Sequence, residues 1–386
     1  MKIMFVAAAL LAGLASVPAQ AATPAAPVAP AAIWAQDGYG PGNTGYNPGE
    51  SVVNSGTIKK LKLRWTVKPR AASPGCQPAA RTPIIVDGRA YVLEGDGVAA
   101  YSAATGKRLW LNEEFSFISA GLVAADGMII VNSTNCYSQS NYDGAVVALD
   151  AKTGVTRWRE LQSWMIDTVV ADRGAVVVSG YCGTCEDAHH GVVAFRTADG
   201  SELWQHPNAV LAGPVAAGGR IMLRSTTRPE SSVVDLATGD LLWGTGSLWS
   251  ARAANPAGDQ LYLWNSVGLS AVRAANAKTL WRVRGEAGDL ASDGRRVFVA
   301  SANRVNAYHA TTGKLEWTRA VATPKRPIRA GGLLYVQSKK SLVILSPVNG
   351  KPVASGMPFG TISDHVVVTG GRLYATSGWS VRSYTP

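Results

Sequence analysis

The 386-residue chain has no apolar run long enough to cross a membrane. Its longest, residues 3–14, falls short of the roughly 20 apolar residues that a transmembrane helix needs. The run follows Lys2 and precedes the small-residue triplet Ala-Gln-Ala at residues 19–21, a pattern typical of a secretory signal peptide. We therefore expect residues 1–21 to be a signal peptide, and the mature protein to be secreted or periplasmic.

Cysteine is scarce, with four in the whole chain, and the first is Cys76. No cysteine stands directly after the expected cleavage site, so the lipid attachment that tethers an exported lipoprotein is not expected. Residues 22–33 are almost entirely Ala and Pro, a composition typical of an extended tether. We expect one folded domain over residues 34–386.

Sequence motifs of common enzymes are also missing. The chain has no Gly-x-Ser-x-Gly elbow, no phosphate-binding loop and no His-Glu-x-x-His pair. Three of the five histidines, His206, His309 and His365, occur singly in or beside apolar runs, and we interpret them as surface or packing residues. No catalytic residue is predicted, and the interpretation leans away from an enzyme.

The basic residues are numerous but dispersed. The formal net charge is +11, yet no run of five or more basic residues occurs. This favours a basic solvated surface with weak attraction to anionic surfaces, rather than a specific nucleic-acid site.

What the chain does contain is a repeated phrase. "AYSAATGKRLW" at residues 100–110 returns as "ALDAKTGVTRW" at 148–158, and four further copies follow, the last being "AYHATTGKLEW". A degenerate copy, "ILSPVNGKPVA", has Ala354 in place of the final tryptophan, and "LKLRW" ends at Trp65 without the preceding turn. The recurring tryptophans are Trp65, Trp110, Trp158, Trp204, Trp243, Trp281 and Trp317. Successive tryptophans of this set are 36 to 48 residues apart. A repeat of this length indicates a solenoid or propeller.

Each repeat has four short apolar or alternating runs, which in the first lie at residues 83–86, 89–93, 98–102 and 108–112. Asp-Gly, Gly-Asp-Gly and Thr-Gly-Lys separate them, as in hairpins between β-strands. We name these strands A to D. One such sheet cannot bury both faces alone, whereas sheets stacked radially around an axis can, as in a β-propeller.

The two ends of the chain should complete one blade. The last segment, "HVVVTGGRLYATSGWSVRSYTP", supplies three strands and lacks the fourth, while residues 61–67 form a D strand with nothing before it. Seven complete units plus this shared one predict an all-β, eight-bladed propeller of four-stranded antiparallel blades, closed by the N-terminal strand. We expect a monomer.

The Ala-x-x-x-x-Thr-Gly-x-x-x-Trp phrase resembles the tryptophan-docking motif of pyrroloquinoline-quinone-type eight-bladed propellers, over almost all of the mature chain. The opening "WAQDGYGPGNTGYNPGE" also resembles the segment that precedes the first blade in that family. The resemblance implies that the seven motif tryptophans stack between neighbouring blades.

That family has two main branches. Quinoprotein dehydrogenases hold the quinone and calcium at the propeller axis and often have a disulfide between adjacent cysteines, which this sequence lacks. The compact repeats are more similar to the non-catalytic BamB type, which binds partner proteins of the bacterial envelope. We therefore expect a binding or scaffold protein with an envelope or extracellular partner and no cofactor; the alternative is a dehydrogenase with the quinone and calcium.

The four cysteines fall in D-to-A and B-to-C loops. Loops of these two kinds emerge on the same side of the ring, so we expect all four cysteines on one face. Of the three possible pairings we favour Cys182 with Cys185 and Cys76 with Cys136. The segment "GYCGTCEDAHHG" leaves two alternatives open, a zinc site and a redox-active pair, the third functional possibility for this protein.

Five tryptophans, including Trp34 and Trp264, lie outside the docking position. Trp164 and Trp249 fall in D-to-A loops and Trp379 in a B-to-C loop, which places these three on the cysteine face. They are candidates for a binding face; the alternative is that they pack beneath longer loops.

Overall fold

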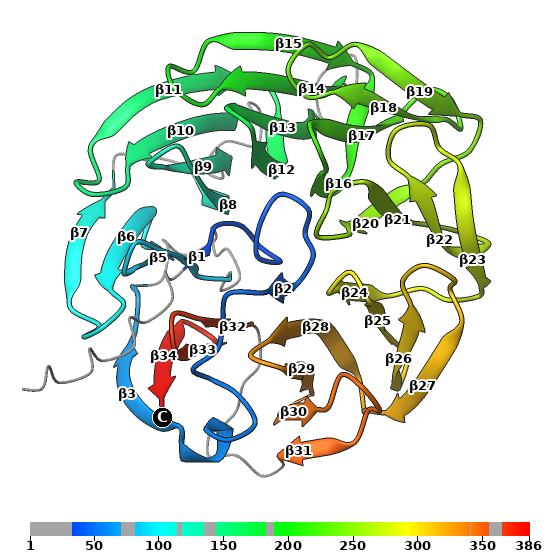
Figure 1. The fold of residues 1–386 in the computed structure, drawn as a ribbon. Helices are drawn as coiled ribbons and strands as arrows, with labels where there is room; N and C mark the ends of the chain where they lie inside the picture. Colours follow the sequence, from blue (N-terminus) through cyan, green and yellow to red (C-terminus); the bar gives the residue numbers. More distant parts are fainter. Residues whose placement is uncertain are drawn as a thin grey trace, which may run out of the picture.

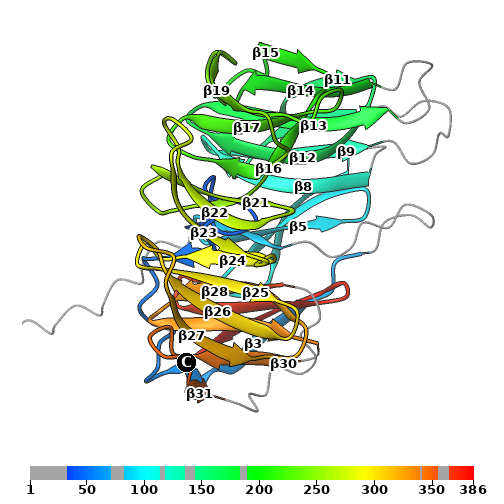
Figure 2. The ribbon, with the colours of Figure 1, turned by 90° about the vertical axis from the view of Figure 1, so that its right-hand side faces the viewer.

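The computed structural model describes residues 33–70, 82–113, 118–134, 144–182, 189–339, 341–354 and 365–386, which form eight antiparallel sheets around one axis (Figure 1). Each sheet is one blade. In seven blades the four strands follow each other in sequence from the axis to the outer edge, and in the eighth the outermost strand comes from the N-terminal part of the chain. Seen from the side, the strands run across the thickness of the ring (Figure 2). The eight-bladed propeller expected from the repeats is confirmed.

The first four blades come in chain order. They are blade 1, β4 (Ile84–Val86), β5 (Arg89–Glu94), β6 (Gly97–Ser102) and β7 (Arg108–Asn112); blade 2, β8 (Ile118–Ala125), β9 (Met128–Thr134), β10 (Gly144–Asp150) and β11 (Thr156–Gln162); blade 3, β12 (Met165–Asp172), β13 (Ala175–Cys182), β14 (His189–Arg196) and β15 (Glu202–Pro207); and blade 4, β16 (Ala209–Ala216), β17 (Arg220–Ser225), β18 (Ser231–Asp235) and β19 (Leu241–Thr245).

The next three blades repeat the pattern, and the eighth combines both ends of the chain. They are blade 5, β20 (Ser250–Ala254), β21 (Gln260–Asn265), β22 (Gly268–Arg273) and β23 (Thr279–Arg284); blade 6, β24 (Asp289–Ser292), β25 (Arg296–Ser301), β26 (Arg304–His309) and β27 (Leu315–Ala320); blade 7, β28 (Pro324–Ala330), β29 (Leu333–Ser338), β30 (Ser341–Leu345) and β31 (Pro352–Ala354); and blade 8, β32 (Val366–Thr369), β33 (Arg372–Ser377), β34 (Ser380–Thr385) and the N-terminal β3 (Lys62–Val67).

Local sequence explains the tight turns of the blades. Between β4 and β5, Asp87 and Gly88 both have positive φ, 49° and 71°, as a type I′ hairpin turn requires. Asp126 and Gly127 repeat the geometry between β8 and β9, with φ of 49° and 76°. The Asp-Gly pairs therefore mark the A-to-B turns correctly.

A β-bulge precedes the docking position in the outer strand of each blade. In blade 1 the register shifts between Ala100, which faces Trp110, and Tyr101, which faces Arg108, so one residue has no partner. The same shift recurs in the outer pair of all the other blades. Because a bulge re-aims the following side chain, it turns the indole toward the next blade.

Each motif tryptophan contacts the turn of the following blade. The indole N–H of Trp204 donates to the carbonyl of Leu236 over 2.9 Å, and the ring lies against Gly239, where an added Cβ would come within 2.7 Å of it. The other six make the equivalent hydrogen bond: Trp65 to Ala103, Trp110 to Ala151, Trp158 to Thr197, Trp243 to Ala274, Trp281 to Ala310 and Trp317 to Pro347. The repeated phrase thus supplies both sides of each contact.

The boundary between blades 7 and 8 is built differently. Ala354 occupies the tryptophan position of blade 7, and blade 8 has no C-to-D turn to receive an indole, because its C and D strands come from opposite ends of the chain. Val53, Ile58 and Leu61 of the N-terminal segment are buried in the same cluster as Ala354. The carboxylate of Glu50 accepts hydrogen bonds from the backbone N–H groups of Val52, Val53 and Gly371. This segment fills the boundary that lacks the motif.

Residues 33–48, which we call the axial strap, run around the inside of the ring (Figure 1). Strand β1 (Ile33–Trp34) pairs with β4, and β2 (Tyr46–Asn47) pairs in parallel with β28. Between them the strap bonds to the innermost strands in order: Ala35 to Ala124, Gln36 to Ala171, Pro41 to Ala216, Gly42 to Ala254, Thr44 to Ser292, Gly45 to Arg329, and finally Asn47 to Val368. The strap therefore touches every blade.

Candidate functional site

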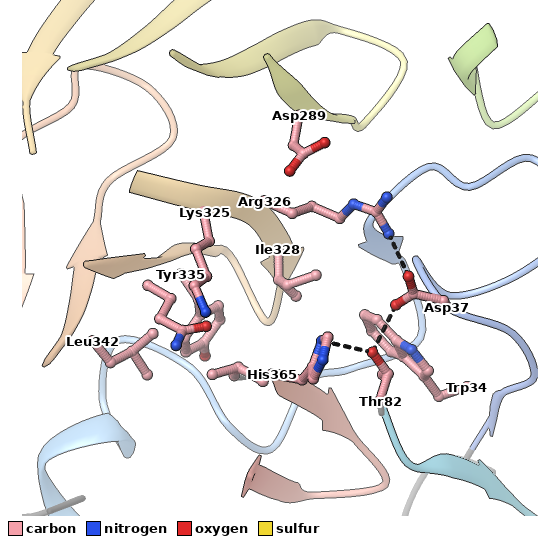
Figure 3. Close-up of a pocket in the computed structure, with 12 residues that line it drawn as sticks. Trp34, Asp37, Thr82, Asp289, Lys325, Arg326, Ile328, Tyr335, Leu342 and His365 are labelled. Carbon is pink, nitrogen blue, oxygen red and sulfur yellow. Dashed lines mark hydrogen bonds and ion pairs between the residues drawn. The ribbon is translucent and has the colours of Figure 1, made fainter. Parts of the chain in front are cut away.

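A cavity of about 380 Å³ lies between the axial strap and the innermost strands of blades 6, 7 and 8 (Figure 3). Trp34 and Asp37 enter it from the strap, Thr82 from the residues before β4, Arg326 from β28 and His365 from the residue before β32. Lys325 and Asp289 add further charges, and Ile328, Tyr335 and Leu342 supply an apolar wall. Residues far apart in the chain meet here because their strands begin around the same axis.

Four of these side chains form one hydrogen-bonded chain. Thr82 donates its hydroxyl proton to Oδ1 of Asp37 over 2.7 Å, and Arg326 lies 3.1 Å from the other oxygen of the same carboxylate. Nδ1 of His365 is 2.9 Å from the Thr82 oxygen. Since a hydroxyl has one proton and the carboxylate only accepts, Nδ1 of His365 is the donor in this contact.

This arrangement limits what Asp37 can do. Both carboxylate oxygens already accept a hydrogen bond, one from a hydroxyl and one from a guanidinium group. These two contacts fix the orientation of the carboxylate, and each oxygen keeps a further lone pair. Asp37 therefore orients its neighbours, and the network holds the strap to blades 1, 7 and 8.

A smaller hollow of about 180 Å³ shares Asp37, Thr82 and His365 and extends toward blades 2 and 3. Asp167 of β12 lines it, and desolvation by the surrounding protein raises the pKa of this carboxyl above its ordinary value, more than its contacts with Thr168 and Ser179 lower it. Asp167 is nevertheless an exposed residue, so the raised pKa by itself assigns it no role. No motif in the sequence identifies it.

The described residues do not fit calcium. Within the described ranges, no group of three or more His, Cys, Asp or Glu side chains is arranged to hold a metal ion. The two aspartates of the larger cavity come from separate elements, and Asp37 is engaged by Thr82 and Arg326. No step is therefore assigned to a bound metal.

The cavity residues were not found from the sequence. The sequence predicts that His365 is a surface or packing residue, and its ring lies on the cavity wall, in contact with Thr82. Asp37 belongs to the opening segment that resembles the family's pre-blade segment, which was the one available signal. Thr82 and Arg326 belong to no repeated motif, so their role depends on the closed ring.

Cys182 ends strand β13, is 2% exposed and is disulfide-bonded. Cys76, Cys136 and Cys185 lie outside the described residues, so the favoured pairing stays a prediction. The zinc alternative for the Cys182 loop falls on the same undescribed segment, as does part of the redox alternative.

The three tryptophans of the candidate binding face differ in exposure. Trp164 and Trp249 are each 8% exposed and belong to the buried clusters between blades 2 and 3 and between blades 4 and 5. Such side chains offer little surface to a partner, which favours the packing alternative for both. Trp379 is partly exposed and stays a candidate.

No helix in the described part of the chain is long and apolar enough to cross a bilayer.

Comparison with known proteins identifies one family model and many similar propellers. The model described as outer membrane protein assembly factor BamB matches residues 56–263 and 265–355. Among solved structures, BamB from Moraxella catarrhalis superposes with a TM-score of 0.59 at 16% identity, covering 84% of this chain and 98% of that one.

Quinoprotein enzymes are similar as well. Quinohemoprotein alcohol dehydrogenase from Comamonas testosteroni is 23% identical over 260 residues, 56% of this chain and 34% of the relative. The structure of alcohol dehydrogenase ADHIIG from Pseudomonas putida HK5 superposes with a TM-score of 0.68 at 14% identity, covering 92% of this chain and 80% of that one. The chain spans 20% to 39% of the length of the first curated relatives. At these identities the structural likeness shows the propeller fold alone.

Proposed function

The chain belongs to the family of outer membrane protein assembly factor BamB, and from this premise we propose that it is an exported, non-catalytic propeller that binds a partner protein in the cell envelope. The rigid ring is the scaffold, and its surface is the functional part. The axial network of Asp37, Thr82 and His365 holds the strap in this proposal and needs no cofactor.

The observation that carries the proposal is the apolar outer edge of blade 4. Leu241 and Leu242 are adjacent on β19 and are 67% and 44% exposed, and Leu248 follows at 43%. Beside them is a hollow of about 310 Å³, lined in part by Leu241, Gly244 and Gly246. Adjacent exposed leucines next to a hollow are what a partner's apolar side chains can contact.

Capture of a partner tests this surface. The wild-type protein, immobilised, should retain a defined protein from cell-envelope extract, and the double variant Leu241→Asp/Leu242→Asp should lose it. The matched control is Leu315→Asp/Val348→Asp, which places the same charges at residues 49% and 61% exposed on blades 6 and 7. Both variants should keep the wild-type melting temperature, because exposed side chains contribute little to folding.

Two results would sink the proposal. One is that the wild-type protein retains no protein above the level of a blank resin; the other is that both double variants lose capture equally. If capture depends on Trp379→Ala instead, the partner binds the face expected from the sequence, and blade 4 is not the contact.

A quinoprotein dehydrogenase is the second candidate, supported by the curated relatives and by the axial cavity with Lys325, Arg326 and His365. These cationic and polar groups would hold the acidic groups of the quinone, which when bound supplies the oxidising chemistry. A thermal-shift titration with pyrroloquinoline quinone and calcium separates the two candidates, because a ligand of the native state raises the melting temperature. No shift at saturating quinone would remove the enzyme.

A further inference from the structure

The outer edge of blade 8 carries a strip of cations that no ligand or partner explains. We define the β3 strip as Lys59 and Lys60 of the short helix η1 (Ile58–Lys60), Lys62 and Arg64 of β3, and Lys68 just beyond it. All five side chains belong to exposed residues. Because β3 is the outermost strand of its blade, the strip lies at the outer edge of the ring (Figure 1).

The strip has no acidic residue in its own strand or in the described strands of its blade. The described part of blade 8, together with residues 58–70, contains no Asp or Glu. Among the described residues, no ion pair or hydrogen bond engages the side chains of the four lysines, and Arg64 bonds to Thr385 and to the main-chain carbonyl of Pro386. Some surface arginines elsewhere have carboxylate partners, as Arg157 has Asp150 and Arg228 has Glu230. The positive charge of the strip is therefore left to solvent or to an anionic surface.

An apolar side chain lies within the strip. Leu63 is 54% exposed between Lys62 and Arg64, where it can enter the outer part of a bilayer while the flanking cations stay at the phosphates. The one aromatic ring of β3, Trp65, is 9% exposed and docked on Ala103, so it cannot stack on a base. This combination fits anionic lipid better than a single-stranded nucleic acid, which is bound largely by stacking on aromatic rings.

The position of the strip also fits attachment to a surface. Blade 8 lies opposite blade 4 across the ring (Figure 1). A bilayer that touches the outer edge of blade 8 leaves β19 and its exposed leucines pointing away from the membrane. Attachment and partner binding can then occur together.

We propose that the β3 strip binds the phosphate groups of an anionic lipid bilayer and places the propeller edge-on against the membrane. This inference does not depend on the proposed partner, since it concerns a different blade and a different class of ligand. The interaction is electrostatic with a small apolar contribution, so it should weaken as the salt concentration rises.

Vesicle co-sedimentation tests the strip. The full chain should bind vesicles of equal parts phosphatidylglycerol and phosphatidylcholine and should not bind phosphatidylcholine alone. The triple variant Lys59→Gln/Lys60→Gln/Lys62→Gln should bind the anionic vesicles about a hundredfold more weakly, since each lysine near such a surface contributes about fivefold.

The matched control removes the same charge elsewhere. Lys152→Gln/Lys278→Gln/Lys314→Gln changes three exposed lysines in the C-to-D turns of blades 2, 5 and 6. This variant should retain binding within about threefold of wild type, because its lysines lie outside the strip. Melting temperatures of both variants should match wild type and so exclude misfolding.

Three outcomes would overturn the proposal. The first is equal binding of the wild-type chain to anionic and neutral vesicles. The second is an equal loss of binding in the two triple variants, and the third is tighter binding of duplex DNA than of vesicles through the strip. The second outcome would mean that net charge alone drives the attraction. The third would assign the strip to a nucleic acid.

Discussion

At the scale of single residues, the turns that receive the motif tryptophans show how one Cβ atom affects stability. Six of the seven turns place a glycine with positive φ against the tryptophan of the preceding blade: Gly106, Gly154, Gly200, Gly239, Gly313 and Gly350. Blade 5 has Ala277 at that position, with φ of 59°. A left-handed backbone costs an alanine roughly 1–2 kcal/mol that it does not cost glycine.

The substitution Ala277→Gly should therefore stabilise the protein by about 1 kcal/mol. Urea unfolding measures this as a higher midpoint with an unchanged slope. Gly313→Ala is the matched control, since its new Cβ would lie 2.7 Å from the Trp281 ring, and it should lower the midpoint. A neutral or destabilising Ala277→Gly would mean that the turn of blade 5 relaxes around its methyl group.

At the scale of the element, the contact between an outer strand and the next turn is the unit of assembly. Its parts are the bulge, the indole ring, the hydrogen bond to the turn carbonyl and the glycine beneath the ring. Blade 7 keeps the bulge but has Ala354 in place of the indole, and the blade that would receive that indole has no C-to-D turn.

Trp204→Ala should cost about 3–5 kcal/mol of unfolding free energy, since the ring is 8% exposed between two sheets and its hydrogen bond is lost as well. Thermal and urea unfolding both measure it. The reverse change Ala354→Trp should bring no gain, because no turn is present to accept the indole. If Trp204→Ala left the free energy of unfolding unchanged, or Ala354→Trp raised it, the docking interpretation would be contradicted.

At the scale of the whole molecule, the axial strap joins all eight blades. It is an acceptor for the backbone amides of Ala124, Ala216, Ala254, Ser292 and Arg329, which belong to five different blades. A local loss of the strap should therefore be felt around the entire ring. This differs from a loop, whose removal affects its neighbours alone.

A chain that begins at Ser51 keeps β3 and every blade but lacks the strap. We expect it to melt at a lower temperature and to exchange the amides of β8, β16, β20, β24 and β28 faster, because these amides lose their acceptors. Amide hydrogen exchange read by mass spectrometry follows each strand. Faster exchange confined to blade 1 would show that the strap matters only where β1 pairs with β4.

The sequence by itself determined the blades. The Asp-Gly turns, the alternating strands and the repeated tryptophan act over fewer than about ten residues, so their geometry follows from local backbone preferences. The eight-blade count and the closure by residues 61–67 also followed, because the missing strand at one end matched the unpaired strand at the other.

Which residues meet at the axis, and which side chains stay exposed, depends on the tertiary structure alone. Asp37, Thr82, Arg326 and His365 come from four separate parts of the chain, and no short-range pattern records that ring closure brings them together. The burial of Trp164 and Trp249 and the bonding of the strap to every blade likewise depend on which strands become neighbours. Contacts between distant residues depend on how whole blades pack together. The repeated phrase predicts that the blades form a ring, but it does not predict which of their side chains meet.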